Sequence, residues 1–273
     1  MRLWGPTKQL AISAQLNHDP TALDWSPDGN LLAVGDRNGS CLLLDANTLA
    51  VLGTYKGKFT GKKHAWIEDI KFSPDGRYIA YGTHGGLSPL EIVEVQPNKK
   101  LKKYATANVG LTSALTHLDW SQDSETIMVN SQANELMFIG LGSKKQISAS
   151  ATKGTEWATM TCLFGWPVQG IWPGLDYTDV NATCRSRNGL VLATGDDFGV
   201  VKLFKYPCVK EKAGSTDHYG HSSHVTGVKF TADDTLVVST GGNDKTVFVW
   251  DTDFNDDDQA LFGVGGGVGG AAQ

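Results

Sequence analysis

Three histidines lie close together in the stretch DHYGHSSH and are the first candidates for chemistry. His218, His221 and His224 are spaced three residues apart. A metal site would require their side chains to converge, because zinc takes its ligands in a tetrahedral arrangement. We favour a structural interpretation, in which His221 is an interior histidine and the other two lie at a rim. The sequence therefore predicts neither a metal nor a cofactor.

A pair of neighbouring carboxylates, Asp196 and Asp197 in TGDDFG, is the second candidate. Two carboxylates side by side suggest acid–base catalysis. Equivalent stretches elsewhere in the chain also carry Asp or Asn, which is typical of tight turns. The chain contains neither a Gly-x-Ser-x-Gly elbow nor an HExxH sequence. The sequence thus predicts a protein that is not an enzyme.

Composition limits the classes of partner. The chain has 273 residues, 19% of them charged, and a net charge of -5, which argues against a nucleic-acid binder. Its four cysteines lie far apart with no CxxC pair, which favours a reducing compartment over a disulfide framework. No apolar run approaches the ~20 residues of a membrane span. The composition predicts a soluble, intracellular protein.

A repeated phrase supplies the elements that must position these residues. Each repeat has one aromatic or basic residue at an equivalent position, called its anchor. The anchors are Trp25, Phe72, Trp120, Arg185 and Phe230, and successive anchors are separated by 47, 48, 65 and 45 residues. After each anchor comes a Ser-Pro-Asp-Gly type of turn, then an apolar strand, a second turn and a third strand. Short strands at this spacing predict an all-β repeat fold.

The period of the repeats and the Trp-Asp ending resemble the WD-repeat family, which implies β-propeller blades of four strands. The last repeat, GHSSHVTGVKFTADDTLVVSTGGNDKTVFVWD, matches best. The resemblance implies a stabilising side-chain network of His221, Thr240, Asp244 and Trp250. At the position of Trp250 the other repeats carry apolar residues, which are Leu44, Val93, Ile139 and Phe204. We expect those blades to depend on apolar burial instead.

The domain prediction follows from the repeats. MRLW at the start resembles the end of a strand from an earlier repeat. We expect one propeller domain over 1–253, most of one propeller from a tandem pair, and a flexible tail rich in Asp and Gly over 254–273. The predicted repeats lie near 21–49, 68–95, 116–141, 181–207 and 226–252, with an insert at 154–180.

The insert carries the most specific resemblance. TEWATMTCLFGWPVQGIWPGLDYTDVNATCRS, followed by LATGDDFGVVKLFKYPC, is similar to the second propeller of the echinoderm microtubule-associated protein-like family. Its alternating pattern predicts extra β structure, in WATMTCLF and again over 168–172. We expect Trp157, Trp166 and Trp172 to belong to the core, because large aromatics usually supply packing area.

The resemblance implies a microtubule-associated scaffold that binds tubulin, in the cytoplasm or a ciliary axoneme. General WD-repeat adaptors are the alternative. Two basic loops are candidate contacts for an acidic partner, although solvated surface is the interpretation we favour for them. Their residues are Lys56, Lys58, Lys62 and Lys63 in the first loop and Lys99, Lys100, Lys102 and Lys103 in the second.

Overall fold

The fold is all-β and consists of five β-propeller blades, seen in a computed structural model. The structure describes residues 1–4, 8–58, 60–84, 90–107, 110–172 and 179–252. The predicted tail at 254–273 and residues 173–178 of the insert lie outside this part. The chain divides into two compact units, Met1–Phe164 and Gly165–Gln273, which are described separately.

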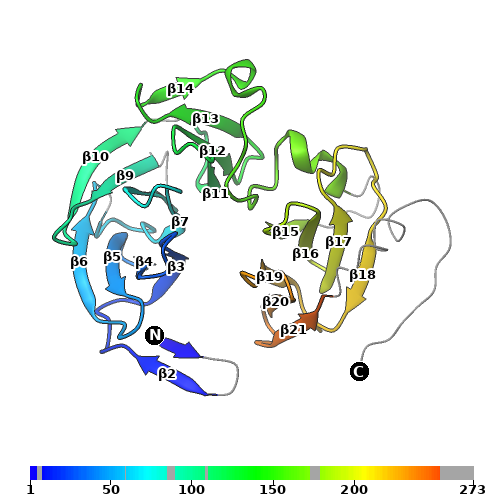
Figure 1. The fold of residues 1–273 in the computed structure, drawn as a ribbon, viewed down its shortest axis with the longest axis horizontal. Coiled ribbons are helices and arrows are strands. Elements are labelled where there is room, and N and C mark those ends of the chain that lie inside the picture. Colours follow the sequence, from blue (N-terminus) through cyan, green and yellow to red (C-terminus); the bar gives the residue numbers. More distant parts are fainter. Residues whose placement is uncertain (5–7, 59, 85–89, 108–109, 173–178, 253–273) are drawn as a thin grey trace. The chain divides into compact units, whose positions relative to one another are not determined.

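The first unit contains a hairpin and three blades, coloured blue to green in Figure 1. The hairpin pairs β1 (Arg2–Trp4) with β2 (Gln9–Ile12), so the predicted partial strand is followed by a second one. Each blade is an antiparallel meander of four strands. The blades are β3 (Pro20–Trp25), β4 (Leu31–Asp36), β5 (Ser40–Asp45) and β6 (Val51–Lys56); β7 (Ile67–Phe72), β8 (Tyr78–Thr83), β9 (Leu90–Val95) and β10 (Leu101–Ala107); and β11 (Leu115–Trp120), β12 (Thr126–Ser131), β13 (Leu136–Gly140) and β14 (Lys145–Ile147).

The second unit contains two further blades. The fourth blade is β15 (Val180–Arg185), β16 (Val191–Asp196), β17 (Val200–Lys205) and β18 (Thr216–Tyr219). The fifth has three strands within the described residues, β19 (Val225–Phe230), β20 (Leu236–Gly241) and β21 (Val247–Asp251).

Apolar cores lie between successive blades within each unit. Leu90 and Ile92 of the second blade share one cluster with Leu118 and Trp120 of the third. Strand β4 is buried along its whole length, because the second blade covers one face of its sheet and the N-terminal hairpin covers the other. Strand β8 of the second blade is likewise buried along its whole length. Burial on both faces explains why LLAV and YIAY are continuous apolar runs.

The first turn of each repeat closes as its sequence predicts. In the first blade Ser26 Oγ donates to Asp28 Oδ1 at 2.5 Å, and the same hydroxyl accepts from the Leu31 N–H at 2.9 Å. Gly29 takes a φ of 71°, which glycine adopts without strain. The same arrangement recurs at Ser73–Asp75, Ser121–Asp123, Ser186–Asn188 and Thr231–Asp233.

The predicted β structure of the insert is wrong. WATMTCLF forms no strand, apart from an isolated bridge between Ser121 and Trp157. Residues 166–171, which overlap the second predicted strand, form the 3-10 helix η2 (Trp166–Ile171), and η1 (Ala149–Thr152) precedes the insert. Neither 3-10 helix nor any other helix of the described chain has the length and apolar run that a membrane crossing requires.

Candidate functional site

A hydrogen-bond network joins His221 to the fifth blade. His221 Nδ1 lies 3.2 Å from Asp244 Oδ2 and 3.0 Å from Thr246 Oγ1, and His221 Nε2 lies 2.8 Å from Ser239 Oγ. The Trp250 indole N–H donates to the same Ser239 hydroxyl at 2.8 Å. Both imidazole nitrogens therefore have partners, as a buried histidine requires.

Ser239 occupies the place in this network that the sequence pattern assigned to Thr240. Thr240 is exposed, and its hydroxyl lies 2.9 Å from Thr226 Oγ1. Because successive strand residues point to opposite faces, only one of these neighbours can face His221. Thr240 is thus corrected to Ser239 as the member that contacts His221 and Trp250.

The environment of Asp244 keeps its carboxylate ionised. Burial opposes the charge, but hydrogen bonds from Thr246, His221 and the Ser222 N–H outweigh it and lower the pKa of Asp244. The pKa of His218 is lowered chiefly by burial, against the pull of Asp217. Among the described residues, no three His, Cys, Asp or Glu side chains are placed to hold a metal ion.

The residues at the position of Trp250 in the other blades are apolar and buried. Each of the five lies opposite the second residue of its neighbouring strand, as in the pairs Leu44↔Leu32 and Trp250↔Val237. The remaining pairs are Val93↔Ile79, Ile139↔Ile127 and Phe204↔Leu192. The four apolar members are at most 3% exposed.

The Asp196–Asp197 pair belongs to a turn. Asp196 Oδ1 accepts from the N–H groups of Phe198 and Val200 at 3.0 and 2.9 Å. Asp36 makes the same pair of bonds, to Asn38 and Ser40, in the first blade. Asp197 instead accepts from the Asn181 side chain at 2.8 Å. The two carboxylates therefore have separate partners.

A buried charge cluster lies on the innermost strands, where the sequence pattern had not indicated one. Lys71 Nζ lies 3.2 Å from Asp69 Oδ1, and Asp24 and Asp119 also act on it electrostatically. Burial disfavours the ammonium, but the three carboxylates outweigh that effect and raise the pKa of Lys71. The detectable signal was a charged residue in the middle of the otherwise apolar phrases LDW and IKF.

The three carboxylates of this cluster bind the backbone of the next segment. Asp24 Oδ2 accepts from the Phe72 N–H at 2.8 Å, and Asp69 Oδ2 accepts from the Leu118 N–H at 2.9 Å. Asp119 Oδ2 accepts from two N–H groups of the insert, those of Thr161 and Cys162, each at 2.7 Å. Each carboxylate therefore connects its own blade to the next blade or, in the third blade, to the insert.

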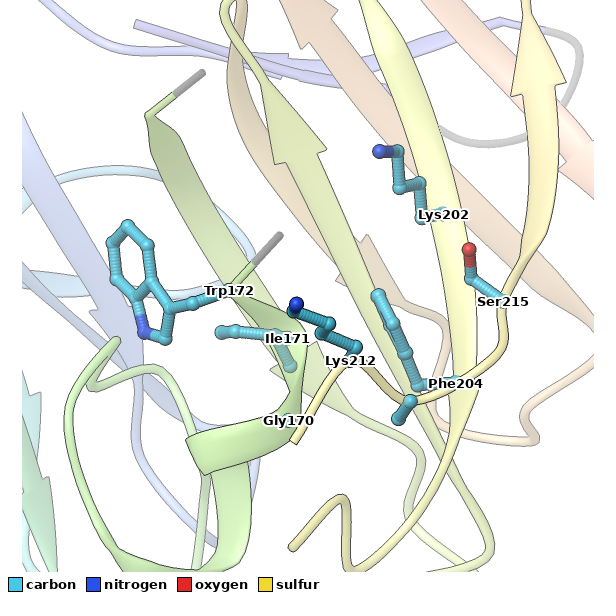
Figure 2. Close-up of a pocket in the computed structure, with 8 residues that line it drawn as sticks. Gly170, Ile171, Trp172, Lys202, Phe204, Lys212 and Ser215 are labelled. Carbon is cyan, nitrogen blue, oxygen red and sulfur yellow. The ribbon is translucent and has the colours of Figure 1, made fainter. Parts of the chain in front are cut away.

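The tryptophans of the insert differ in environment. Trp157 is 8% exposed and stacks on Phe138, with 5.9 Å between ring centroids. Trp166 is 65% exposed, so its assignment to the core is wrong. Trp172 is half-buried and lines a hollow in the second unit, where Figure 2 shows its ring beside Ile171.

The structure separates the two lysine loops. We call the end of a blade at which its innermost strand begins the leading end, and the opposite end the trailing end. In the first blade the leading end carries Pro20, Asp36 and Lys56. The first lysine loop starts at Lys56, and its Gly61 N–H donates to Asn38 O at 2.9 Å, so it lies at this end.

The second lysine loop lies at the trailing end. Lys99 and Lys100 join β9 to β10 beyond the pair Val95↔Leu101, which is at the end where β7 finishes. Thr21 Oγ1 donates to Ile67 O at 2.7 Å, which places the leading ends of the first two blades side by side. All eight lysines are exposed, but the two loops do not form one surface.

Aromatic side chains accompany the first lysine loop. Trp66 and His84 stack with 4.0 Å between ring centroids at an interplanar angle of 14°. Glu68 Oε2 holds both rings, accepting from Trp66 Nε1 at 2.7 Å and lying 3.2 Å from His84 Nδ1. The second loop instead has an acidic neighbour, because Lys102 pairs with Glu94 across the strands.

Comparison with known proteins extends over almost the whole chain. The family described as echinoderm microtubule-associated protein second beta-propeller matches residues 1–252. Echinoderm microtubule-associated protein-like 2 of Homo sapiens is 40% identical over 253 residues, covering 92% of this chain and 38% of the relative.

Two further relatives give similar values. Echinoderm microtubule-associated protein-like 3 of Homo sapiens is 38% identical over 252 residues, covering 91% of this chain and 27% of the relative. The 77 kDa echinoderm microtubule-associated protein of Strongylocentrotus purpuratus is 41% identical over 228 residues, covering 83% and 32%. The chain therefore spans between 27% and 38% of the length of these relatives.

Proposed function

Because the chain belongs to the echinoderm microtubule-associated protein-like family, as its second β-propeller, we propose that it is part of a non-catalytic scaffold on microtubules. The scaffold binds tubulin or assembled microtubules, in the cytoplasm and its cytoskeleton, with the ciliary axoneme as one site of action. The observation that carries the proposal is the match of residues 1–252 to this one propeller, together with the relatives' names.

The site geometry supports a scaffold over an enzyme. The interior carboxylates of Asp24, Asp69 and Asp119 all accept hydrogen bonds from backbone N–H groups. A general acid or base must reach a substrate atom. Carboxylates that hold successive segments together are committed to the architecture.

The leading-end lysine loop is the contact that we propose for an acidic partner. Lys56, Lys62 and Lys63 are exposed, and Lys62 and Lys63 lie within four residues of Trp66, whose ring stacks on His84. Positive surface speeds the encounter with an acidic surface, and aromatic side chains often anchor protein contacts. The trailing-end loop faces the opposite way and has Glu94 across from Lys102, which favours a solvated role for it.

Co-sedimentation with microtubules tests the proposal, using the full chain at two salt concentrations. Changing Lys56, Lys58, Lys62 and Lys63 to Ser should weaken binding, and binding of the unchanged protein should fall as salt rises. The matched control changes Lys99, Lys100, Lys102 and Lys103 to Ser and should bind as before. Absence of co-sedimentation would reject the tubulin-binding function, and equal losses in both variants would reject the chosen loop.

A general adaptor in another protein complex is the second candidate. Exposed apolar side chains favour it, because they mark surfaces that contact other proteins. Leu23 and Trp25 on β3 are 56% and 43% exposed, and Val247 and Val249 on β21 are 65% and 59% exposed. Affinity purification that recovers a stable complex without tubulin would favour this function.

A further inference from the structure

A hollow of about 250 Å³ lies in the second unit beside η2. Its lining combines two cations with apolar and aromatic surface, from Ile171, Trp172, Lys202, Phe204, Lys212 and Ser215. In Figure 2, Trp172 and Ile171 lie on one side, Lys202, Phe204 and Ser215 lie on the other, and Lys212 stands between them.

The hollow is built by contacts between η2 and the loop that precedes β18. The Cys208 N–H donates to Pro167 O at 2.7 Å, and the Gly170 N–H donates to Cys208 O at 2.8 Å. A Cβ on Gly170 would lie 2.3 Å from Lys210 O, so only glycine allows this approach. These contacts fix the walls before any ligand arrives.

Within the described residues, neither lysine of the hollow donates a hydrogen bond from its side chain. The Lys202 side chain is 18% exposed, and its Nζ lies 3.6 Å from Asp196 Oδ2, beyond hydrogen-bond distance. That oxygen has no hydrogen-bond partner within the described part of the chain. Lys212 is exposed. Lys202 thus forms an ion pair with Asp196, and because that contact is longer than a hydrogen bond, its ammonium gains a closer acceptor when an anion enters the hollow.

The rest of the lining suits an apolar group next to that anion. Phe204 is 3% exposed, and with Ile171 and Trp172 it gives the hollow an apolar wall. The lining residues include no Asp or Glu, and the acidic neighbours of Lys202 outside the lining are Asp196 and, across the strands, Asp217. The arrangement thus has two chemical halves, one cationic and one apolar.

We propose that this hollow binds an acidic peptide segment, with a carboxylate side chain between Lys202 and Lys212. A neighbouring apolar side chain of the peptide then packs on Phe204, Ile171 and Trp172. The volume is below the roughly 300–1,000 Å³ of pockets that enclose a whole small ligand, which favours one or two side chains of a peptide.

The neighbouring strand supports a peptide as the occupant. β18 begins directly after Ser215 and, within the described residues, is the outermost strand of its sheet. Edge strands leave backbone groups available to an extended peptide. The site is distinct from the lysine loop proposed for the acidic partner above, and each can fail without the other.

A titration of the full chain with a short peptide of glutamates and one leucine tests the proposal. The indole NMR signal of Trp172, assigned by its loss in Trp172→Phe, reports binding at this hollow. Lys212→Gln should weaken binding about tenfold, as expected for one lost charge-assisted hydrogen bond. Lys205→Gln removes an exposed cation from β17, the strand that carries Lys202, at a position outside the lining of the hollow. It should leave the affinity within about twofold.

Three results would overturn the proposal. They are equal binding of the same peptide with glutamine in place of glutamate, equal weakening by Lys205→Gln, and no shift of the Trp172 signal. A Trp172 shift with inorganic phosphate as strong as with the peptide would replace the peptide site by a small-anion site. Lys202→Gln gives a second measurement of the cationic half of the hollow. Lys212→Gln is the decisive variant, because Lys212 is exposed and its loss leaves Asp196 unaffected.

Discussion

Two joints in the first unit each contain a carboxylate but differ in what surrounds it. One connects the second blade to the third, and the other connects the third blade to the insert. In the first, Asp69 binds the Leu118 N–H, and Gly82 makes room for Leu115, whose Cδ2 would lie 2.6 Å from an added Cβ. In the second, Asp119 binds Thr161 and Cys162, and Asn130 stands at the position of Gly82.

The difference arises from the backbone of the neighbouring segment. The innermost strand of a blade satisfies most of its backbone within its sheet, so its joint needs one carboxylate for a remaining N–H, together with space for apolar side chains. The insert has no sheet partners over these residues, so its N–H and C=O groups need side chains. Asn130 supplies both kinds of bond to Phe164, donating to its O at 3.2 Å and accepting from its N–H at 2.9 Å.

The largest expected effect comes from Asp119→Ala. Removal of this fully buried carboxylate leaves two N–H groups of the insert without their acceptor and Lys71 with less compensation. Loss of one partner from a buried ionic cluster costs about 3–5 kcal/mol in unfolding free energy. Denaturant melts check the total, and amide exchange at Thr161 and Cys162 checks the location.

The matched control is Asp24→Ala, because Asp24 is half-buried and its carboxylate accepts from the Phe72 N–H of the next blade. It should destabilise the protein less than Asp119→Ala. Equal losses would show that the insert is held by its other contacts and that the polar joint is incidental.

The second prediction exchanges the residue types, Gly82 and Asn130, that distinguish the two joints. Gly82→Asn places a side chain where Leu115 lies and should cost about 1–3 kcal/mol by overpacking. Asn130→Gly removes two hydrogen bonds to Phe164 and should cost a similar amount, about 2 kcal/mol in total at about 1 kcal/mol for each net bond. Urea melts of both variants, with hydrogen exchange at Phe164, separate the two mechanisms.

The features that were predicted from sequence are those that local pattern controls. The turn from Ser26 to Leu31 closes within six residues, so its residue types were enough to predict it. Leu44, the apolar residue at the position of Trp250, is fully buried, as its residue type predicted. The insert could not be predicted in this way, because Asp119 lies about 40 residues before its donors and overrides the local alternation of WATMTCLF.

The candidate sites were harder to predict, for two physical reasons. Ser239 and Thr240 differ by one residue, and a shift of one exchanges the faces of a strand. The separation of the lysine loops depends on strand order, since Lys56 ends the fourth strand of a blade whereas Lys99 lies between a third and a fourth. Composition treats the two loops as alike.

The third prediction extends the comparison to the fifth blade, whose interior contains a polar network beside its apolar cluster. Ser239→Ala removes the hydroxyl that contacts both His221 and Trp250 and should cost about 1 kcal/mol. Thr240→Ala changes the adjacent exposed residue and should cost less than about 0.5 kcal/mol. Thermal melts and the indole NMR signal of Trp250 measure the two variants, and the reverse order would restore Thr240 to the network.

The smallest expected effect concerns the turn between the first two strands of a blade, which carries a charged residue in the first blade and an uncharged one in the fourth. Hydrogen bonds from Ser26 and Asn30 lower the pKa of Asp28 from 3.8 to about 2, whereas the fourth blade has the uncharged Asn188 in the same place. A depressed carboxyl pKa contributes stability that is present above the unfolded value and is lost as pH falls through the folded value. The turn at Asp28 should therefore weaken between about pH 4 and pH 2, whereas the turn at Asn188 has no ionisable side chain at the equivalent position. Amide NMR signals of Leu31 and Val191, which occupy equivalent positions, measure the two turns in one pH series. The same series on Asp28→Asn should abolish the shift at Leu31, and a shift that persists in this variant would assign the transition to another carboxylate.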